Sequence, residues 1–225
     1  MITAGTRLVA LLGHPVGHSL SPQIQNAAFA ALALDWAYVA LDVPPDRLEE
    51  AVRGLAAAGF AGANVTAPHK LAVAKLVDTD APSVNTLIFR DGMIEGTSTD
   101  AAILERLVTK HPVVLGDGGA AQAFLRALPH ARSFARRGEW PPDIGGADLV
   151  VNATAARNEV VVEVRAGQTL VDLPYPDSAT AAAAREAGAD VRDGFDVLVA
   201  QGAASFSCWT GMPAPVETMR AALGR

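Results

Sequence analysis

One segment, Phe60-Ala61-Gly62-Ala63-Asn64-Val65-Thr66-Ala67-Pro68-His69-Lys70, carries the first indication of both fold and site. Its apolar, strand-like part runs from Phe60 to Val65 and ends in polar residues. Loops that follow strands in α/β proteins gather polar side chains at the carboxyl edge of the sheet, where ligands bind. We therefore expect Asn64, Thr66 and Lys70 to converge on one small polar molecule.

Lys70 is the candidate for chemistry in this segment. Almost all basic residues of the chain are arginines, and its lysines are Lys70, Lys75 and Lys110. An arginine in a protein does not release its proton, whereas a lysine partly desolvated in a cleft can. The alternative is that Pro68 opens a helix and Lys70 is a solvated residue of its first turn.

Composition narrows the class of protein. The 225 residues suit one large or two small domains, and half of them are apolar, enough for a sizeable core. A net charge of -6 without a basic block argues against nucleic-acid binding. The lone Cys208 gives neither a disulfide nor a thiolate pair for a metal, and the apolar run Leu8–Leu12 is too short for a signal or membrane segment. We expect a cytoplasmic metabolic enzyme, monomer or homodimer, that binds a small molecule and no metal.

Strand-like and helix-like segments alternate along the first half. The predicted strands are Arg7–Leu12, Trp36–Val43, Phe60–Val65, Ser83–Phe89 and Met93–Glu95. The predicted helices begin at Ser21-Pro22 with Ser21 as the cap, at Pro44-Pro45-Asp46, at Leu71 and after Asp100, the last one carrying Ala101, Leu104 and Leu107. This alternation predicts an α/β fold with a largely parallel sheet and right-handed crossovers.

Further polar side chains lie in the loops of this pattern. Ser19 follows the first strand, Ser21 and Asn26 stand at the start of the first helix, Asn85 heads the fourth strand, and Asp100 follows Gly96-Thr97-Ser98-Thr99. Taken singly, Ser21 is explained as a helix cap and Asp100 as a carboxylate that favours a helix terminus. Together with the segment Asn64–Lys70, however, these motifs resemble the shikimate dehydrogenase family in their order and near their spacing.

The resemblance implies a function and a site. It implies reversible, NADP-dependent reduction of 3-dehydroshikimate to shikimate in aromatic amino acid biosynthesis, with Lys70 as proton donor and Asp100 holding and tuning it. The implied substrate ligands are Ser19, Ser21, Asn64, Thr66, Asn85, Tyr175 and Gln201. Tyr175 comes from the segment Asp172–Tyr175, and Gln201 from a closing helix that begins near Gly194.

The second half resembles a dinucleotide-binding unit. A strand from Val113 runs into a glycine turn and a helix, where small residues let backbone amides approach a pyrophosphate. Arg136 follows the next expected strand, where an arginine pairs with the 2′-phosphate of NADP, and a strand from Asp148 ends in Asn152-Ala153-Thr154. The predicted cofactor ligands are Gly116, Gly118, Gly119, Ala120, Arg136, Asn152 and Thr154.

This organisation predicts two domains with a cleft between them. Residues 1–100 with 201–225 would bind substrate, and residues 101–200 would form a reduced Rossmann-like NADP domain. The chain is shorter than typical family members, with trimming before Val84 and between Arg137 and Asp148. Ser98, Gln25 and Val197 replace an expected asparagine, histidine and methionine. Asp117 puts a carboxylate in the glycine turn, from which we expect weak NADP binding unless its side chain points to solvent or caps the helix.

Three alternatives stay open. A quinate-type or amino-substituted substrate would use the same pair of residues. A non-catalytic homologue would bind the cyclic acid without turnover, which a shortened cofactor half permits. A methyltransferase could have a similar sheet, but it would need its own acidic-glycine motif at the first strand, and this hypothesis leaves Lys70 without a role.

Overall fold

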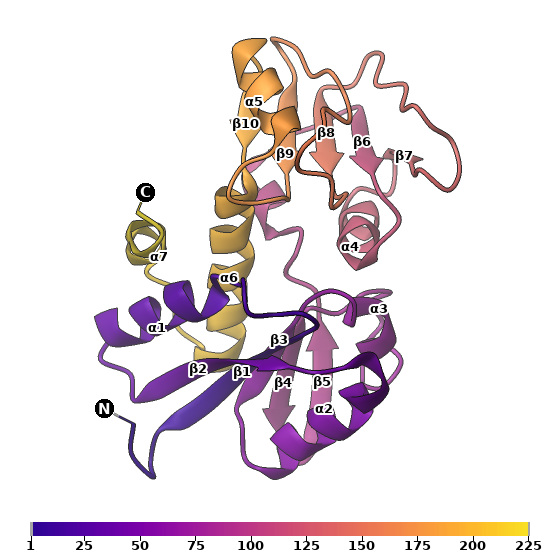
Figure 1. The fold of residues 1–225 in the computed structure, drawn as a ribbon. Helices are drawn as coiled ribbons and strands as arrows, with labels where there is room; N and C mark the ends of the chain where they lie inside the picture. Colours follow the sequence, from indigo (N-terminus) through magenta and orange to yellow (C-terminus); the bar gives the residue numbers. More distant parts are fainter. Residues whose placement is uncertain (1, 225) are drawn as a thin grey trace. The chain divides into compact units, whose positions relative to one another are not determined.

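The computed structural model describes residues 2–224 and contains two five-stranded sheets with helices packed against them (Figure 1). The chain forms two compact units. One unit consists of the residues up to Thr99 together with those from Val199 onward, and the other is Asp100–Leu198. The predicted α/β fold is confirmed. The assignment of substrate to one unit and cofactor to the other stays a prediction.

The first unit is built on a sheet with the order β2-β1-β3-β4-β5. Its strands are β1 (Arg7–Gly13), β2 (Trp36–Asp42), β3 (Gly62–Val65), β4 (Thr86–Arg90) and β5 (Met93–Thr97). β1 pairs in parallel with both β2 and β3, whereas β4 and β5 form an antiparallel hairpin that continues from β3. Since β3 is central and fully buried, its polar residue Asn64 needs hydrogen-bond partners inside the protein.

Helices cover both faces of this sheet. They are α1 (Ser21–Ala31), α2 (Leu48–Ala57), α3 (Lys70–Val73), α7 (Val216–Ala222) and the part of α6 (Gly194–Thr210) that belongs to this unit. α2 buries Leu48, Val52 and Leu55 against one face. On α6, Trp209 donates from Nε1 to the Leu87 carbonyl at 2.9 Å, and a Cβ added at Gly62 would lie 2.4 Å from that nitrogen. Glycine at position 62 therefore lets α6 approach β3 directly.

The second unit has an entirely parallel sheet with the order β10-β9-β8-β6-β7. Its strands are β6 (Pro112–Leu115), β7 (Arg132–Phe134), β8 (Leu149–Asn152), β9 (Thr169–Asp172) and β10 (Asp190–Arg192). α4 (Gly119–Ala127) packs Ala121 and Phe124 on one face, and α5 (Ala179–Glu186) packs Ala181 and Ala184 on the other. The connections 135–148 and 153–168 contain no helix or strand, as the trimming between Arg137 and Asp148 predicted for the first of them.

The predicted α-helix after Asp100 is wrong. Residues Ala102–Arg106 form a 3₁₀ helix, and Leu107 is already extended. Of the predicted apolar residues Ala101, Leu104 and Leu107, only Leu104 lies inside this short helix. The β-branched pair Val108-Thr109 follows at once and disfavours further helix.

The predicted capping role of Ser21 is also wrong. α1 begins at Ser21 itself, its N-cap residue is Leu20, and no side chain caps this helix. Pro22 still stands in the first turn, where its missing N–H costs nothing. The Ser21 hydroxyl instead receives a hydrogen bond from Ser19.

The amino end of β8 is anchored by Asp148, the residue just before the strand. Its carboxylate accepts hydrogen bonds from the Thr109 hydroxyl and from the backbone N–H groups of Lys110 and His111, the latter two at 2.7 and 3.0 Å. Burial pushes the pKa of Asp148 upward, but these hydrogen bonds together outweigh it and bring the pKa to about 2.

Asp148→Asn should lower the free energy of unfolding at neutral pH by about 1–3 kcal/mol, because one of the two acceptor oxygens becomes an NH₂ group and the remaining hydrogen bonds lose their charge. A depressed pKa stabilises the fold above the unfolded-state value, and this contribution is lost as the pH falls from 3.8 toward about 2. The gap between wild type and variant in urea unfolding should therefore narrow as the buffer is made acidic. A gap that is constant or widens in acid would contradict this account.

Candidate active site

The loop that carries Lys70 is held by hydrogen bonds from both neighbouring parts of the first sheet. Thr66 donates its N–H to the Leu12 carbonyl at 2.8 Å, and Val84 donates its N–H to the Lys70 carbonyl at 3.0 Å. A Cβ added at Gly13 would lie 2.5 Å from the Thr66 side chain, so the end of β1 lies directly against this loop. Lys70 is half-buried and is the first residue of α3.

His69, the residue before the lysine, is a buried anchor. Its Nε2 lies 2.7 Å from the Val43 carbonyl oxygen. A carbonyl only accepts hydrogen bonds, so Nε2 carries the proton in this contact. The imidazole thus fixes the backbone immediately before Lys70.

Asn64 is the centre of a buried polar network. Its Oδ1 accepts a hydrogen bond from the Tyr38 hydroxyl at 2.8 Å. Its Nδ2 donates to the Asn85 carbonyl at 2.9 Å and to the Thr86 and Ser205 hydroxyls at 3.1 and 2.9 Å. Both polar ends of this amide are therefore bonded to protein, and the role of Asn64 as a substrate ligand stays a prediction.

Asn85 is oriented by the same network. The backbone N–H of Thr99 donates to Asn85 Oδ1 at 2.7 Å, and because an N–H can only donate, this contact decides which end of the amide is oxygen. The opposite end, Nδ2, lies 3.4 Å from Gln201 Oε1. Two predicted ligands far apart in sequence, Asn85 and Gln201, are thus brought together, and Thr99 lies directly before Asp100.

The three hydroxyls of this network were not identified from the sequence. Thr86 and Thr99, Thr86 and Ser205, and Thr99 and Ser205 approach within 3.3, 2.9 and 3.0 Å. Their positions carried a signal, since Thr86 and Thr99 adjoin the predicted residues Asn85 and Asp100, and Ser205 lies one helical turn after Gln201. Hydroxyl residues in such positions can hold the neighbouring predicted site residue in place by hydrogen bonds.

The two serines of the first loop also lie together. The Ser19 hydroxyl donates to the Ser21 hydroxyl at 3.3 Å and accepts from the Ser21 N–H at 3.2 Å. Asn26, the third polar residue of this motif, is bonded to a different part of the unit. Its amide bonds both backbone groups of Tyr38, at 2.9 Å each, because β2 is an edge strand whose outer polar groups need partners.

The glycine turn of the second unit has the features that a pyrophosphate requires. Gly116 has φ of +118°, and a Cβ there would lie 3.0 Å from the Ala153 carbonyl oxygen. Gly118 is the N-cap of α4, and a Cβ added to it would meet nothing within 4 Å. The N–H groups of the first turn, from Gly119 and Ala120 onward, have no partner within the helix, so this end fits an anionic group.

Asp117 is exposed and precedes the N-cap, so the alternative that it caps α4 is wrong. Glycine occupies the capping position, and no side chain caps this helix. The expected repulsion between Asp117 and a bound phosphate stays a prediction.

Arg136 lies just after β7, as predicted. Its guanidinium forms an ion pair with Glu159 and lies over the Trp140 ring, 5.3 Å from the ring centre. Both partners of the pair are about half exposed, with exposed fractions of 51% and 55%. A phosphate at this position would therefore share Arg136 with a carboxylate.

The remaining predicted ligands divide between the two units. Asn152 and Thr154 end β8 and are bonded to each other, at 2.7 Å between the Thr154 hydroxyl and Asn152 Oδ1. Tyr175 stacks on Phe195 with ring centres 6.0 Å apart. Tyr175 and Asp100 belong to the second unit with all the cofactor candidates, whereas the other substrate candidates and Lys70 belong to the first.

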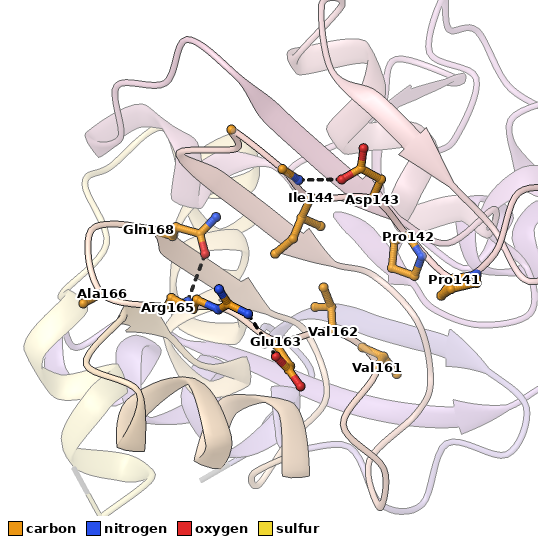
Figure 2. A pocket seen from close by; sticks show the side chains of 12 residues that line it. Pro141, Pro142, Asp143, Ile144, Val161, Val162, Glu163, Arg165, Ala166 and Gln168 are labelled. Atoms are coloured by element: carbon orange, nitrogen blue, oxygen red, sulfur yellow. Dashed lines mark hydrogen bonds and ion pairs between the residues drawn. The ribbon is translucent and has the colours of Figure 1, made fainter.

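A groove of about 620 Å³ also lies in the second unit, between residues 141–146 and 161–168 (Figure 2). Figure 2 shows Arg165 beside Glu163 and Gln168 along it. None of the predicted site residues lines this groove.

Among residues 2–224, no group of three or more histidine, cysteine, aspartate or glutamate side chains is placed to hold a metal ion. Within the same range, no helix has both the length and the apolar character needed to cross a membrane.

One unit has an entirely parallel sheet with a glycine turn, and the other carries a lysine and a buried amide network. These features define a two-unit α/β protein whose second unit is Rossmann-like. Comparison with known proteins specifies the family. The family described as "Shikimate dehydrogenase substrate binding domain" matches residues 11–87, and "Shikimate 5'-dehydrogenase C-terminal domain" matches residues 194–223.

Relatives match over the full length. "Shikimate dehydrogenase (NADP(+))" of Anaeromyxobacter dehalogenans is 41% identical over 272 aligned positions, covering 99% of this chain and 98% of that protein. The protein of the same name from Moorella thermoacetica is 38% identical, covering 97% and 92%. The crystal structure of shikimate dehydrogenase from Aquifex aeolicus has a TM-score of 0.90 at 28% identity and covers all of both chains. The Thermus thermophilus enzyme in complex with NADP(H) and shikimate has a TM-score of 0.85 at 28% identity, covering 98% and 99%. The chain belongs to the shikimate dehydrogenase family, as its motifs predicted.

Tyr38→Phe should test the network around Asn64. The substitution removes one hydroxyl and leaves the Asn64 amide oxygen buried without its partner, which should lower the free energy of unfolding by about 1–3 kcal/mol. Urea unfolding measures the loss, and Tyr175→Phe is the matched control because Tyr175 belongs to the other unit. Equal stability of Tyr38→Phe and wild type would show that the network is not a source of stability.

Proposed function

We propose that this chain is an NADP-dependent oxidoreductase that acts on a CH–OH group and reversibly reduces 3-dehydroshikimate to shikimate, a step of aromatic amino acid biosynthesis. The whole-length match carries the proposal, because it spans 98% of a relative named as an NADP(+) shikimate dehydrogenase. Although this chain is shorter than its relative, both halves of the relative have a counterpart in it. The solved Thermus relative with both NADP(H) and shikimate supports the choice of ligands.

In the proposed mechanism Lys70 donates a proton to the oxygen that becomes an alkoxide as the ketone is reduced. Asp100 tunes the acidity of that proton. A positioned general acid contributes about a hundredfold to ten thousandfold to a rate. The substrate is held by hydroxyl and amide groups, which we assign to Ser19, Ser21, Asn64, Thr66, Asn85, Tyr175 and Gln201.

We assign the cofactor to the second unit, where its reduced form, NADPH, would supply the hydride that reduces the ketone and would leave as NADP. We assign the pyrophosphate to Gly116, Gly118, Gly119 and Ala120, because the first turn of α4 offers bare N–H groups. Arg136 would bind the 2′-phosphate, with Glu159 competing for the guanidinium. Asn152 and Thr154 complete the assigned set at the end of β8.

The test of this function is turnover followed by NADPH absorbance, with shikimate and quinate each supplied with NADP and with NAD. Preference for shikimate with NADP supports the proposal, and preference for quinate assigns the same site to that substrate. Binding of shikimate without turnover would identify a non-catalytic homologue. The cytoplasmic setting, the monomeric or homodimeric state and the boundaries 1–100 with 201–225 and 101–200 remain part of the proposal.

Lys70→Ala should lower kcat at least about a hundredfold, the lower limit for loss of a positioned general acid. The melting temperature should hold, because Lys70 is tied into the fold by its backbone carbonyl. Lys75→Ala is the matched control, since Lys75 is exposed and lies in the same unit. Near-normal turnover of Lys70→Ala would exclude the catalytic assignment.

Arg136→Ala should weaken NADP binding by roughly 10- to 100-fold, the equivalent of about 1.5–3 kcal/mol for hydrogen bonds to a charged group. NAD binding should change little, because only NADP carries the 2′-phosphate. Titration of both cofactors into the variant and into Arg137→Ala, the exposed neighbour, measures the difference. Equal losses for NAD and NADP would show that Arg136 does not contact that phosphate.

A further inference from the structure

A fully buried carboxyl group lies beside the predicted cofactor edge and has no role in the mechanism above. Asp172 is the last residue of β9 and has an exposed fraction of 0%. Its Oδ1 accepts a hydrogen bond from Asn152 Nδ2 at 2.7 Å. Its Oδ2 is buried and has no hydrogen-bond partner of normal geometry among residues 2–224. A buried carboxyl with one unsatisfied oxygen is costly, so its retention calls for a reason.

The bond from Asp172 decides how Asn152 is oriented. Because Nδ2 faces the carboxyl group, Oδ1 faces the residues that follow β8 and accepts hydrogen bonds from Thr154, from the N–H at 3.2 Å and from the hydroxyl at 2.7 Å. An asparagine oxygen bonded to the N–H two residues later closes a turn of the backbone. Asp172 thus fixes the turn at residues 152–154 through one side chain.

This turn lies directly against the glycine turn. Ala153 donates its N–H to the Leu115 carbonyl at 2.9 Å, at the end of β6. A Cβ at Gly116 would lie 3.0 Å from the Ala153 carbonyl oxygen and 3.2 Å from its carbon. A shift of the 152–154 turn would therefore displace the backbone at Gly116, just before the helix end assigned to the pyrophosphate.

The surroundings of Asp172 suit a group near a bound anion. Burial is the largest influence and raises its pKa, and the Asp177 carboxylate acts in the same direction. The Ser178 hydroxyl, Asn152 and Arg185 lower the pKa but are outweighed. Burial thus disfavours the charged form of Asp172, and either protonation state leaves Oδ1 able to accept the hydrogen bond from Asn152.

We propose that Asp172 is a positioning residue for the dinucleotide: through Asn152 it fixes the turn at 152–154 against Gly116 and so sets the backbone that binds the pyrophosphate. The proposal rests on the NADP-binding function proposed above. It concerns binding of the cofactor and not proton transfer.

The test is the Kd of NADP, measured by titration without turnover. Asp172→Leu removes the acceptor at similar volume and should weaken NADP binding at least about tenfold, whereas Asp172→Asn keeps an acceptor for Asn152 and should stay within about threefold of wild type. The affinity for shikimate alone should be unchanged in both. Asp148→Asn is the matched control, because it weakens the opposite end of β8 and should lose stability without losing NADP affinity.

If Asp172→Leu does not fold, exchanging the side chains of Asn152 and Asp172 provides a second test. Asn152→Asp alone places two carboxyl groups against each other, and Asp172→Asn added to it restores one donor and one acceptor. The double variant should bind NADP more tightly than Asn152→Asp does, and no recovery would overturn the proposal. Unchanged NADP affinity in Asp172→Leu, or an equal loss in Asp148→Asn, would also overturn it. Failure of wild type to bind NADP would instead reject the proposed function.

Discussion

The first unit depends on the requirement that the buried amide of Asn64 be fully hydrogen-bonded. Each partner comes from a different part of the chain: Tyr38 from β2, Thr86 from β4 and Ser205 from α6. A slip of one residue in the pairing of β3 with β4 would separate Asn64 from Thr86, which are opposite each other in the register. An unsatisfied buried amide costs about 1–3 kcal/mol, so the network specifies this arrangement as well as stabilising it.

The same physical problem is solved a second time at the carboxyl end of β8. Asn152 is buried, and its partners Thr154 and Asp172 come from its own turn and from the neighbouring strand. In both units a buried asparagine near the end of a strand must find hydrogen-bond partners, and the bonds that it forms fix the adjacent loop. Such loops can hold ligand-binding groups because their backbone is as well determined as that of the sheet beside them.

The second unit also shows how a shortened chain keeps its core. The connections 135–148 and 153–168 lack helices, but they place Trp140, Val161, Val162 and Val164 against the sheet face that α5 shares. These apolar side chains thus cover part of the sheet face that a helix would otherwise bury. The groove between these two connections lies on this part of the unit, and none of the residues assigned to substrate or cofactor lines it.

The sequence by itself determined the α/β class, the family, the strands of the first half and the strands that begin near Val113 and Asp148, because apolar runs of strand length and loop motifs such as Asn64–Lys70 are local signals. It also placed Arg136 and the glycine turn correctly after their strands. It did not identify β9 and β10. It failed where local signals were ambiguous or outweighed: Ser21 became the first residue of its helix, and the expected helix after Asp100 is a short 3₁₀ helix that ends before Leu107. Only the tertiary structure decided the orientation of Asn85 and Asn152, the diversion of Asn26 to the edge of β2, and the roles of Thr86, Thr99, Ser205 and Asp172. Those features depend on hydrogen bonds between residues far apart in sequence, and nothing in the spacing of a serine, threonine or aspartate states which buried group it must satisfy.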